Sequence, residues 1–210
     1  MIKHQATVFA GIQTFIESLA KDDISDERKD ILAPLIEYIQ AKVDARAPIN
    51  LNFICTHNSR RSHLSQIWAQ VMAFYFQLEK VYCYSGGTEE TALFPMVAKT
   101  LEATGFSVQK IGGENNPVYA IKFGENEAPI IAFSKTFDDN FNPTSNFAAI
   151  MTCTQADQGC PYIGGAEKRI PITYEDPKAF DNSPEQSAKY AERSRQIAAE
   201  MRYVFSQIKY

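Results

Sequence analysis

The fold is decided by residues 51–64, which read Leu51-Asn52-Phe53-Ile54-Cys55-Thr56-His57-Asn58-Ser59-Arg60-Arg61-Ser62-His63-Leu64. An apolar run ends in Cys55, a short polar loop follows, and a segment with helical apolar periodicity begins after the loop. In a strand–loop–helix arrangement of this kind, the backbone N–H groups of the loop and the N-terminus of the helix converge on one point and attract an anion. The stretch therefore predicts an oxyanion-binding loop at the end of a buried strand.

The residue types in this loop suit sulfur chemistry on an oxyanion. Five residues separate Cys55 from Arg61, and Ser62 follows directly, which gives the pattern C-x5-R-S. A helix N-terminus and a nearby cation favour the thiolate of a cysteine, so we expect Cys55 to act as a nucleophile. Arg61 offers a planar fork of donors to a tetrahedral anion. Ser62 can donate to the sulfur, and Asn58 can hold the loop through backbone groups. The alternative interpretation is a buried cysteine at a strand end beside two solvated arginines.

The composition is that of a soluble globular protein, with 45% hydrophobic and 22% charged residues. The 210 residues suit one domain of ordinary size with an extension. A net charge of −4 argues against a general nucleic-acid binder, and no apolar run approaches the ~18 residues of a membrane span. The N-terminus lacks a secretory pattern. With four cysteines, we therefore expect a cytoplasmic protein whose thiols are reduced and more often catalytic or metal-binding than structural.

Residues 1–48 are predicted to form a helical hairpin that extends a catalytic domain over residues 49–210. Apolar residues of the first helix recur at helical spacing, namely Phe9, Ile12, Phe15, Ile16 and Leu19. The second helix is expected to begin at Ser25, a good N-cap, and to run toward Pro48 with Pro34 inside it or at its true start. We expect this hairpin to pack on the main domain or on a second subunit, which would make a homodimer.

The remaining chain alternates strands and helices. Strands are predicted over residues 49–55, 81–85, 147–152 and 170–172, and helices over residues 62–78, 94–104 and 184–208, the last capped by Ser183. Residues 106–111 are predicted as a short strand or the edge of a loop. Residues 118–123 and 130–134 are predicted as two strands of an inserted hairpin. The alternation indicates an α/β fold with a doubly wound parallel sheet.

The loop from Cys55 to Ser62 resembles the active-site loop of the low-molecular-weight protein tyrosine phosphatases and of the thioredoxin-coupled arsenate reductases on the same fold. The run Tyr84-Ser85-Gly86-Gly87 is similar to the end of their second strand. The resemblance implies a four-stranded parallel sheet of the phosphotyrosine protein phosphatase I-like type. It also implies oxyanion binding by the loop residues Thr56, His57, Asn58, Ser59, Arg60 and Arg61.

Two residues of the loop depart from the family pattern. His57 stands where glycine is usual, which raises the question of backbone strain, because glycine often occupies positions with a positive φ. Arg60 stands where many members carry a second cysteine, and it is expected to add positive charge beside the anion.

A second pair of cysteines, Cys153 and Cys160, follows the strand predicted over residues 147–152. A zinc site is disfavoured, because no second pair and no histidine cluster completes four ligands, so no metal is expected. The pair resembles that of the thioredoxin-coupled arsenate reductases, and the resemblance implies a relay through Cys55, Cys153 and Cys160 with thioredoxin as the final reductant. The alternative is two unrelated loop cysteines. The remaining cysteine, Cys83, lies inside a predicted strand and is expected to fill the core.

Glu175-Asp176-Pro177 matches the Asp-Pro motif of the family, which implies that Asp176 is the general acid. Glu175 is the weaker candidate, and an acidic surface turn before proline is the alternative. The resemblance also allows a monovalent cation near Asn58 and Ser85. Gln66 stands where a carboxylate is expected at such a site, so no cation is assigned.

The best prediction for the function is therefore reduction of arsenate to arsenite, an activity that serves arsenic detoxification. One alternative is a phosphatase for phosphotyrosine or small phosphate esters, in which Cys153 and Cys160 regulate Cys55 by oxidation. The aromatic pair that phosphatases often carry after Asp-Pro is replaced here by Lys178-Ala179-Phe180, which argues against phosphotyrosine. A remote alternative is a non-catalytic sensor of an oxyanion or of redox state.

Overall fold

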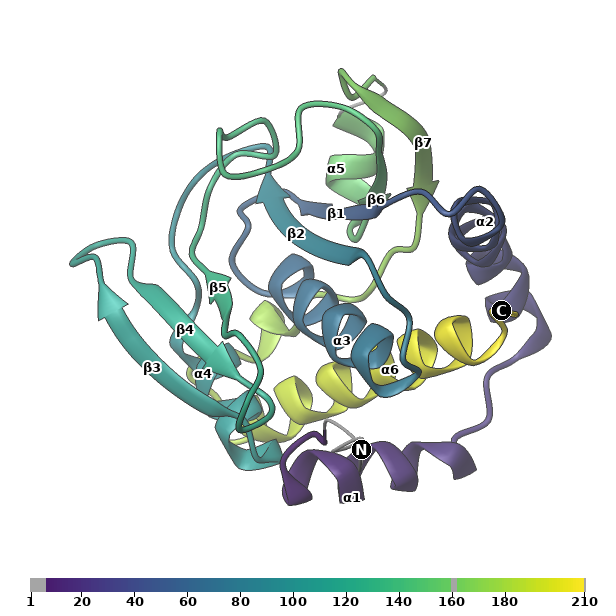
Figure 1. The fold of residues 1–210 in the computed structure, drawn as a ribbon. Helices are drawn as coiled ribbons and strands as arrows, with labels where there is room; N and C mark the ends of the chain where they lie inside the picture. Colours follow the sequence, from purple (N-terminus) through teal and green to yellow (C-terminus); the bar gives the residue numbers. More distant parts are fainter. Residues whose placement is uncertain (1–6, 160–161, 210) are drawn as a thin grey trace.

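The computed structural model describes residues 7–159 and 162–209. Its centre is a four-stranded sheet in the order β2-β1-β6-β7, and all neighbouring strands are parallel. The strands are β1 (Ile49–Cys55), β2 (Val81–Gly87), β6 (Phe147–Met151) and β7 (Ala166–Pro171). Helices α3 (Arg61–Tyr75) and α6 (Gln186–Ser206) lie on one side of the sheet and α5 (Thr154–Gly159) lies on the other (Figure 1). The predicted doubly wound four-stranded parallel sheet is confirmed.

The central strands β1 and β6 are almost wholly buried, as expected of strands covered on both faces; β6 is apolar throughout, and β1 is apolar except for Asn50 and Asn52. Strand β7 is longer than the predicted residues 170–172. It is an edge strand, paired only with β6, and its first residues, Ala166-Glu167-Lys168-Arg169, are polar and only partly buried. A half-exposed edge strand carries no continuous apolar run, which is why its beginning escaped the sequence pattern.

The N-terminal segment contains α1 (Ala10–Ser18), the 3-10 helix η1 (Leu19–Lys21) and α2 (Asp26–Asp44). The predicted cap is confirmed: the hydroxyl of Ser25 accepts a hydrogen bond from the backbone N–H of Arg28 at 3.3 Å. Pro34 lies inside α2. The two helices pack on the main domain, which is one of the two expected arrangements: α1 lies against α4 (Pro95–Thr104) and α6, and α2 lies against α6, β1 and β7 (Figure 1).

The N-terminal helices share the main hydrophobic core of the chain. Ile12, Ile16 and Leu35 are fully buried in the same cluster as Leu51 of β1 and Trp68 of α3. The buried side chains of these two helices are therefore covered within the chain, and the expected homodimer stays a prediction. The domain boundary after residue 48 stays a prediction. Side chains from both sides of it belong to the same hydrophobic cluster.

A second sheet lies beside the first, in the antiparallel order β3-β4-β5. Its strands are β3 (Ser107–Gly112), β4 (Val118–Lys122) and β5 (Ile130–Ala132). The predicted hairpin is the β4–β5 pair, and β3 extends it to three strands. Helix α4 is followed by its C-cap Gly105, whose φ of 107° is strained for other residues, and a Cβ added there would lie 3.1 Å from the Cα of Gly11.

The last two helical segments complete the frame of the site. The 3-10 helix η2 (Pro177–Phe180) follows Asp176, and α6 begins two residues later than residue 184, where we predicted it. The predicted cap is wrong: the N-cap of α6 is Glu185, and Ser183, three residues before the first helical residue, accepts a hydrogen bond from the N–H of Glu185 at 3.2 Å. Among the described residues, no helix combines the length and the apolar character needed to cross a membrane.

Candidate active site

The loop between β1 and α3 connects the last residue of a buried strand to the first turn of a buried helix. Cys55 ends β1 and is 3% exposed, and α3 begins at Arg61. Within the described chain, the backbone N–H groups of residues 56–60 form no hydrogen bond with another residue. Unpaired N–H groups beside a helix N-terminus are the features of an anion site. The structure therefore supports the predicted cradle.

The strained position of the loop is Asn58 and not His57. Asn58 has a φ of 42°, whereas His57 is absent from the described residues with positive φ. Asparagine tolerates this left-handed conformation better than most residues do. Gly87 at the end of β2 presses against the loop, since a Cβ added there would lie 2.7 Å from the oxygen of Thr56. The histidine at the usual glycine position therefore causes no strain.

A chain of hydrogen bonds runs through the loop to the sulfur of Cys55. The side-chain oxygen of Asn58 accepts from the backbone N–H of Lys135 at 2.9 Å, which fixes the orientation of the amide. Its Nδ2 donates to the hydroxyl of Ser62 at 2.9 Å. Because this hydroxyl accepts from Asn58, its own proton is available to Cys55, whose sulfur lies 3.1 Å away. The predicted roles of Asn58 and Ser62 agree with these contacts.

The ring of His63 contacts the loop and the end of β2 through its two nitrogens. His63 is not among the site residues predicted from the sequence. Its Nε2 lies 2.9 Å from the backbone oxygen of Asn58, and its Nδ1 lies 3.2 Å from the hydroxyl of Ser85. A carbonyl oxygen only accepts, so Nε2 carries the proton and Nδ1 accepts from Ser85. Burial, aided by the charge of Lys135, lowers the pKa of His63 to about 3, so the ring is neutral. Its position two residues after Arg61 was the available signal.

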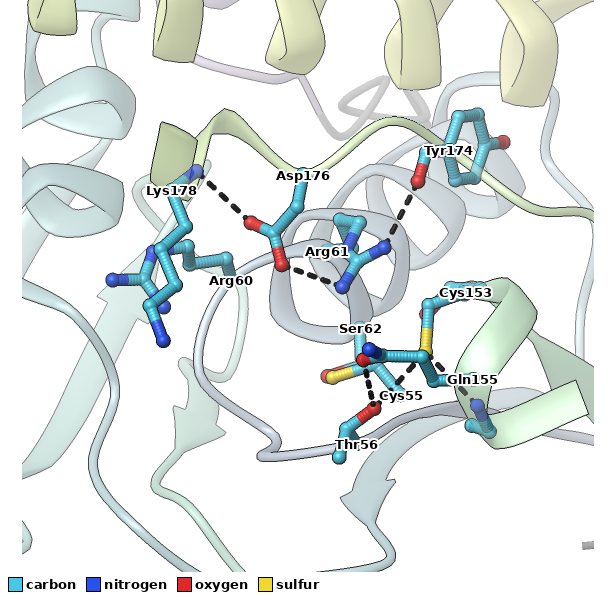
Figure 2. A network of polar contacts seen from close by, with 12 residues as sticks. Cys55, Thr56, Arg60, Arg61, Ser62, Cys153, Gln155, Tyr174, Asp176 and Lys178 are labelled. Carbon is cyan, nitrogen blue, oxygen red and sulfur yellow. Dashed lines mark hydrogen bonds and ion pairs between the residues drawn. The ribbon is translucent and has the colours of Figure 1, made fainter. Parts of the chain in front are cut away.

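Arg61 lies at the bottom of an open cleft and is held by the segment after β7 (Figure 2). Its NH1 donates to the backbone oxygen of Tyr174 at 3.0 Å, and its NH2 pairs with the carboxylate of Asp176 at 2.5 Å. Its Nε is buried and has no hydrogen-bond partner among the described residues. A buried, unpaired guanidinium N–H next to unpaired loop amides is an arrangement that an oxyanion can satisfy.

Asp176 lies in the same cleft as the loop. Its second oxygen accepts from the N–H of Lys178 at 3.0 Å, which caps η2 and fixes the carboxyl group. The cleft has a volume of about 630 Å³ and is lined by residues that include His57, Arg61, Cys153 and Asp176. Glu175 also lines it, but no hydrogen bond of its carboxylate is seen within the described chain. The geometry favours Asp176 over Glu175 as the acid.

Cys153 lies next to the loop as a second buried thiol. It follows β6, is 1% exposed and accepts from the N–H of Ala156 at 3.3 Å in the first turn of α5. Its sulfur lies 3.4 Å from the hydroxyl of Thr56, the residue that follows Cys55 (Figure 2). Both cysteines are free thiols. Cys160, the third thiol of the predicted relay, lies outside the described residues.

The prediction that Arg60 adds charge beside the anion is wrong for its side chain, which points away from the cleft (Figure 2). Its guanidinium donates to the hydroxyl of Tyr190 at 2.5 Å, pairs with Asp181 at 2.6 Å and stacks 4.1 Å from the centre of the Phe94 ring. These partners come from α6 and from the segments before α4 and α6. The side chain of Arg60 therefore ties the loop to the rest of the fold.

The other loop residues are placed by their backbones. The oxygen of Thr56 accepts from the N–H of Glu89, and the oxygen of Ser59 accepts from the N–H of Phe94. The side chain of His57 lines the cleft, partly exposed, with Nε2 3.7 Å from the carboxylate of Glu89. The loop is thus held open by contacts to its carbonyls, which leaves its amides free.

Two of the three residues considered for a monovalent cation are already hydrogen-bonded to neighbours, and the cation stays a prediction. The side-chain oxygen of Asn58 is engaged with Lys135 and the hydroxyl of Ser85 with His63. Gln66 donates to the backbone oxygen of Cys83 and contributes one neutral oxygen that lacks a partner among the described residues. Cys83 fills the core, as predicted, and burial raises the pKa of its thiol. In the described part of the chain, no group of three His, Cys, Asp or Glu residues could hold a metal.

Comparison with protein-family models gives no match, and comparison with curated protein sequences gives none either. Solved structures do resemble the chain. A crystal structure of an arsenate reductase from Archaeoglobus fulgidus DSM 4304 shares 16% identity at a TM-score of 0.48, over 75% of this chain and 99% of that one.

Phosphatases are among the similar structures as well. A low-molecular-weight phosphotyrosine phosphatase from Vibrio cholerae O395 shares 13% identity at a TM-score of 0.47, over 75% of this chain and 94% of that one. An arginine phosphatase from Geobacillus stearothermophilus shares 13% identity at a TM-score of 0.48, over 76% of this chain and 92% of that one. At these identities the likeness concerns the fold, and the activities belong to those proteins.

Proposed function

We propose that the chain reduces arsenate to arsenite through Cys55, Cys153 and Cys160, with thioredoxin as the final reductant. The observation that carries this proposal is the second free thiol beside the first: the sulfur of Cys153 contacts the hydroxyl of Thr56, the residue directly after Cys55. Hydrolysis of a phosphate ester at a C-x5-R loop needs one thiol, whereas reduction of the bound oxyanion needs a thiol pair that can supply two electrons.

Binding would use groups that are unpaired in the described chain. The backbone N–H groups of residues 56–60 and Nε of Arg61 have no hydrogen-bond partner there. The ion pair between Arg61 and Asp176 would loosen as the anion takes the guanidinium. The Cys55 thiolate, with the Ser62 hydroxyl beside it, then attacks arsenic. A sulfur–arsenic bond forms and an oxygen leaves as water, with Asp176 as the proton donor.

Reduction follows when the thiolate of Cys153 attacks the sulfur of Cys55. The new bond is the disulfide between Cys55 and Cys153, and the electron pair of the broken sulfur–arsenic bond stays on arsenic, which leaves as arsenite. Cys160 then attacks Cys153, restores Cys55 and leaves the Cys153–Cys160 disulfide. Two thiols of thioredoxin reduce that disulfide, so the relay belongs in a compartment that keeps thiols reduced, such as the cytoplasm.

A phosphatase is the second candidate, and the position of Asp176 favours it. Its carboxyl group lies in the cleft with Arg61, where a leaving oxygen of an ester would need a proton. In that case Cys55 would carry the phosphoryl group and water would release it. The two thiols at residues 153 and 160 would then regulate Cys55 by oxidation.

The test compares three single-cysteine variants in two assays. Cys153→Ser should abolish arsenate-dependent NADPH oxidation coupled through thioredoxin and its reductase, and Cys55→Ser should abolish this and p-nitrophenyl phosphate hydrolysis as well. Cys83→Ser is the matched control, because this thiol is buried in β2 away from the loop. Arsenate turnover in Cys153→Ser equal to that of the wild type would contradict the relay through Cys153, and a wild type without arsenate turnover would contradict the reductase. If the protein binds phosphate but shows neither activity, the result would support the alternative of a non-catalytic oxyanion sensor.

A further inference from the structure

We infer that Arg28, on the N-terminal helix α2, is a positioning residue for Arg61 and acts through Tyr174. Arg28 lies in the segment before residue 49. The inference gives this segment a part in oxyanion binding. It rests on the proposed oxyanion site, but it does not depend on whether the bound anion is reduced or hydrolysed.

The first step is that one short segment holds Arg61 on two sides. NH1 donates to the backbone oxygen of Tyr174 at 3.0 Å, and NH2 pairs with Asp176 at 2.5 Å. Residues 174–176 therefore set where the guanidinium points. The segment itself is joined to the sheet by one backbone bond, from the N–H of Tyr174 to the oxygen of Thr152 at 3.1 Å.

The second step is that the side chain of Tyr174 anchors this segment in the core. The ring is 6% exposed and belongs to the main hydrophobic cluster, on the side of α2 and α6. The guanidinium carbon of Arg28 lies 4.8 Å from the centre of the ring, within the range of a cation–π contact. Since the backbone of Tyr174 touches Arg61 and its ring touches Arg28, a single residue links the two arginines.

The third step is that Arg28 is itself held rigidly. Its Nε and NH2 both donate to the carboxylate of Glu200 on α6 at 2.8 Å, in the two-pronged geometry that only arginine provides. Glu200 is 3% exposed, so this ion pair is shielded from solvent. The backbone N–H of Arg28 is bonded to the cap residue Ser25. The plane of the guanidinium over the Tyr174 ring is therefore fixed by two helices.

The expected consequence is a loss of oxyanion affinity when Arg28 is replaced. Without the guanidinium, the Tyr174 ring loses a packing contact on one face. The segment that carries the Tyr174 carbonyl and Asp176 then becomes more mobile. A misplacement of about 1 Å in a positioned group can cost up to about a hundredfold in reaction rate. For binding we expect a smaller effect, and Arg28→Gln should raise the Kd for phosphate about tenfold.

The experiment measures phosphate binding to the full chain by titration calorimetry. The matched control is Asp22→Asn, which breaks the 2.6 Å ion pair with Arg195, another tie between the N-terminal segment and α6. That pair makes no contact with Tyr174 among the described residues. The control should leave the phosphate Kd within about twofold, although it also removes an ion pair between the N-terminal segment and α6. A Kd that rises equally in both variants would overturn the inference, because the effect would then be general loosening.

The decisive readout is a double-variant cycle with Arg61→Lys. If Arg28 acts through Arg61, Arg28→Gln should weaken phosphate binding about tenfold in the wild-type background and not measurably further in the Arg61→Lys background. Equal weakening in both backgrounds would overturn the inference. If Arg28→Gln does not fold, Glu200→Gln tests the same ion pair between Arg28 and Glu200 from its other partner. Wild-type protein that binds no phosphate would overturn the oxyanion site itself, which is a different result from binding without dependence on Arg28.

Discussion

The hydroxyl of Ser62 lies 3.1 Å from the sulfur of Cys55 and at the same time accepts a hydrogen bond from Asn58. The amide of Asn58 is oriented in turn by the backbone N–H of Lys135. In this series of hydrogen bonds, Lys135 donates to Asn58 and Asn58 donates to Ser62. The hydroxyl proton of Ser62 is therefore free to bond with the sulfur of Cys55. A hydrogen bond to a charged group contributes roughly 1.5–3 kcal/mol, which is enough to affect the reactivity of the thiolate.

Replacing Ser62 by alanine should therefore slow the alkylation of Cys55 by iodoacetamide about tenfold at pH 7, because the thiolate loses one charged hydrogen bond. The rate is measured by mass spectrometry of the modified peptide. Ser65→Ala is the matched control: Ser65 is buried in the same helix but donates to the backbone oxygen of Arg61 and does not reach the sulfur. Similar rates in the Ser62 variant and the control would refute the role of this hydroxyl.

Asp176→Asn should have two opposite effects. Phosphate should bind severalfold more tightly, since the carboxylate that competes for the guanidinium of Arg61 is gone. Any hydrolysis of p-nitrophenyl phosphate should fall by ~10²–10⁴ in kcat, the usual contribution of a general acid. The measurements are phosphate titration calorimetry and steady-state kinetics. Glu175→Gln, in the same cleft, should change neither quantity by more than about twofold, and a larger effect there would move the acid to Glu175.

Local sequence patterns predicted the strand, loop and helix that form the site. The orientation of its side chains depends on contacts with residues that are distant in the sequence. The strand–loop–helix stretch could be predicted because every signal lies within a few residues of Cys55. The orientation of Arg60 could not be predicted, because its partners Asp181 and Tyr190 lie 121 and 130 residues further along the chain. The clamp between Arg28 and Glu200 spans 172 residues. The sequence therefore suggests that Arg60 faces the anion, whereas in the structure its guanidinium binds Tyr190 and Asp181.

Neighbouring arginines should consequently fail in different ways. Arg60→Met should lower the free energy of unfolding by about 3 kcal/mol, because it leaves the carboxylate of Asp181 largely buried without its guanidinium partner. Its phosphate Kd should stay within about twofold. Arg61→Met should do the reverse, with binding lost and stability little changed. Urea unfolding and phosphate calorimetry on both variants check this, and loss of phosphate binding in the Arg60 variant alone would return Arg60 to the anion site.

The buried ring of His63 makes a pH-dependent contribution to stability. Burial lowers its pKa to about 3 in the folded protein, while an unfolded histidine titrates near ~6.5. Between these values the unfolded chain binds a proton that the folded chain does not. Stability from this residue is therefore complete above ~6.5 and is lost as pH falls toward 3. Lys135 also has a lowered pKa, about 8, through burial, but it titrates above this window.

The wild type should thus lose about 2 kcal/mol of unfolding free energy between pH 7 and pH 5, because each pH unit below the unfolded pKa costs about 1.4 kcal/mol. His63→Gln keeps a donor for the backbone oxygen of Asn58 and has no proton to gain, so its stability should be nearly flat over this range. Urea unfolding at both pH values gives the comparison. His57→Gln is the control, since His57 is 40% exposed at the cleft and outside the buried network. It should keep the wild-type slope. Equal slopes in the His63 variant and the wild type would mean that the ring is not buried as a neutral group, and that the loop is supported in another way.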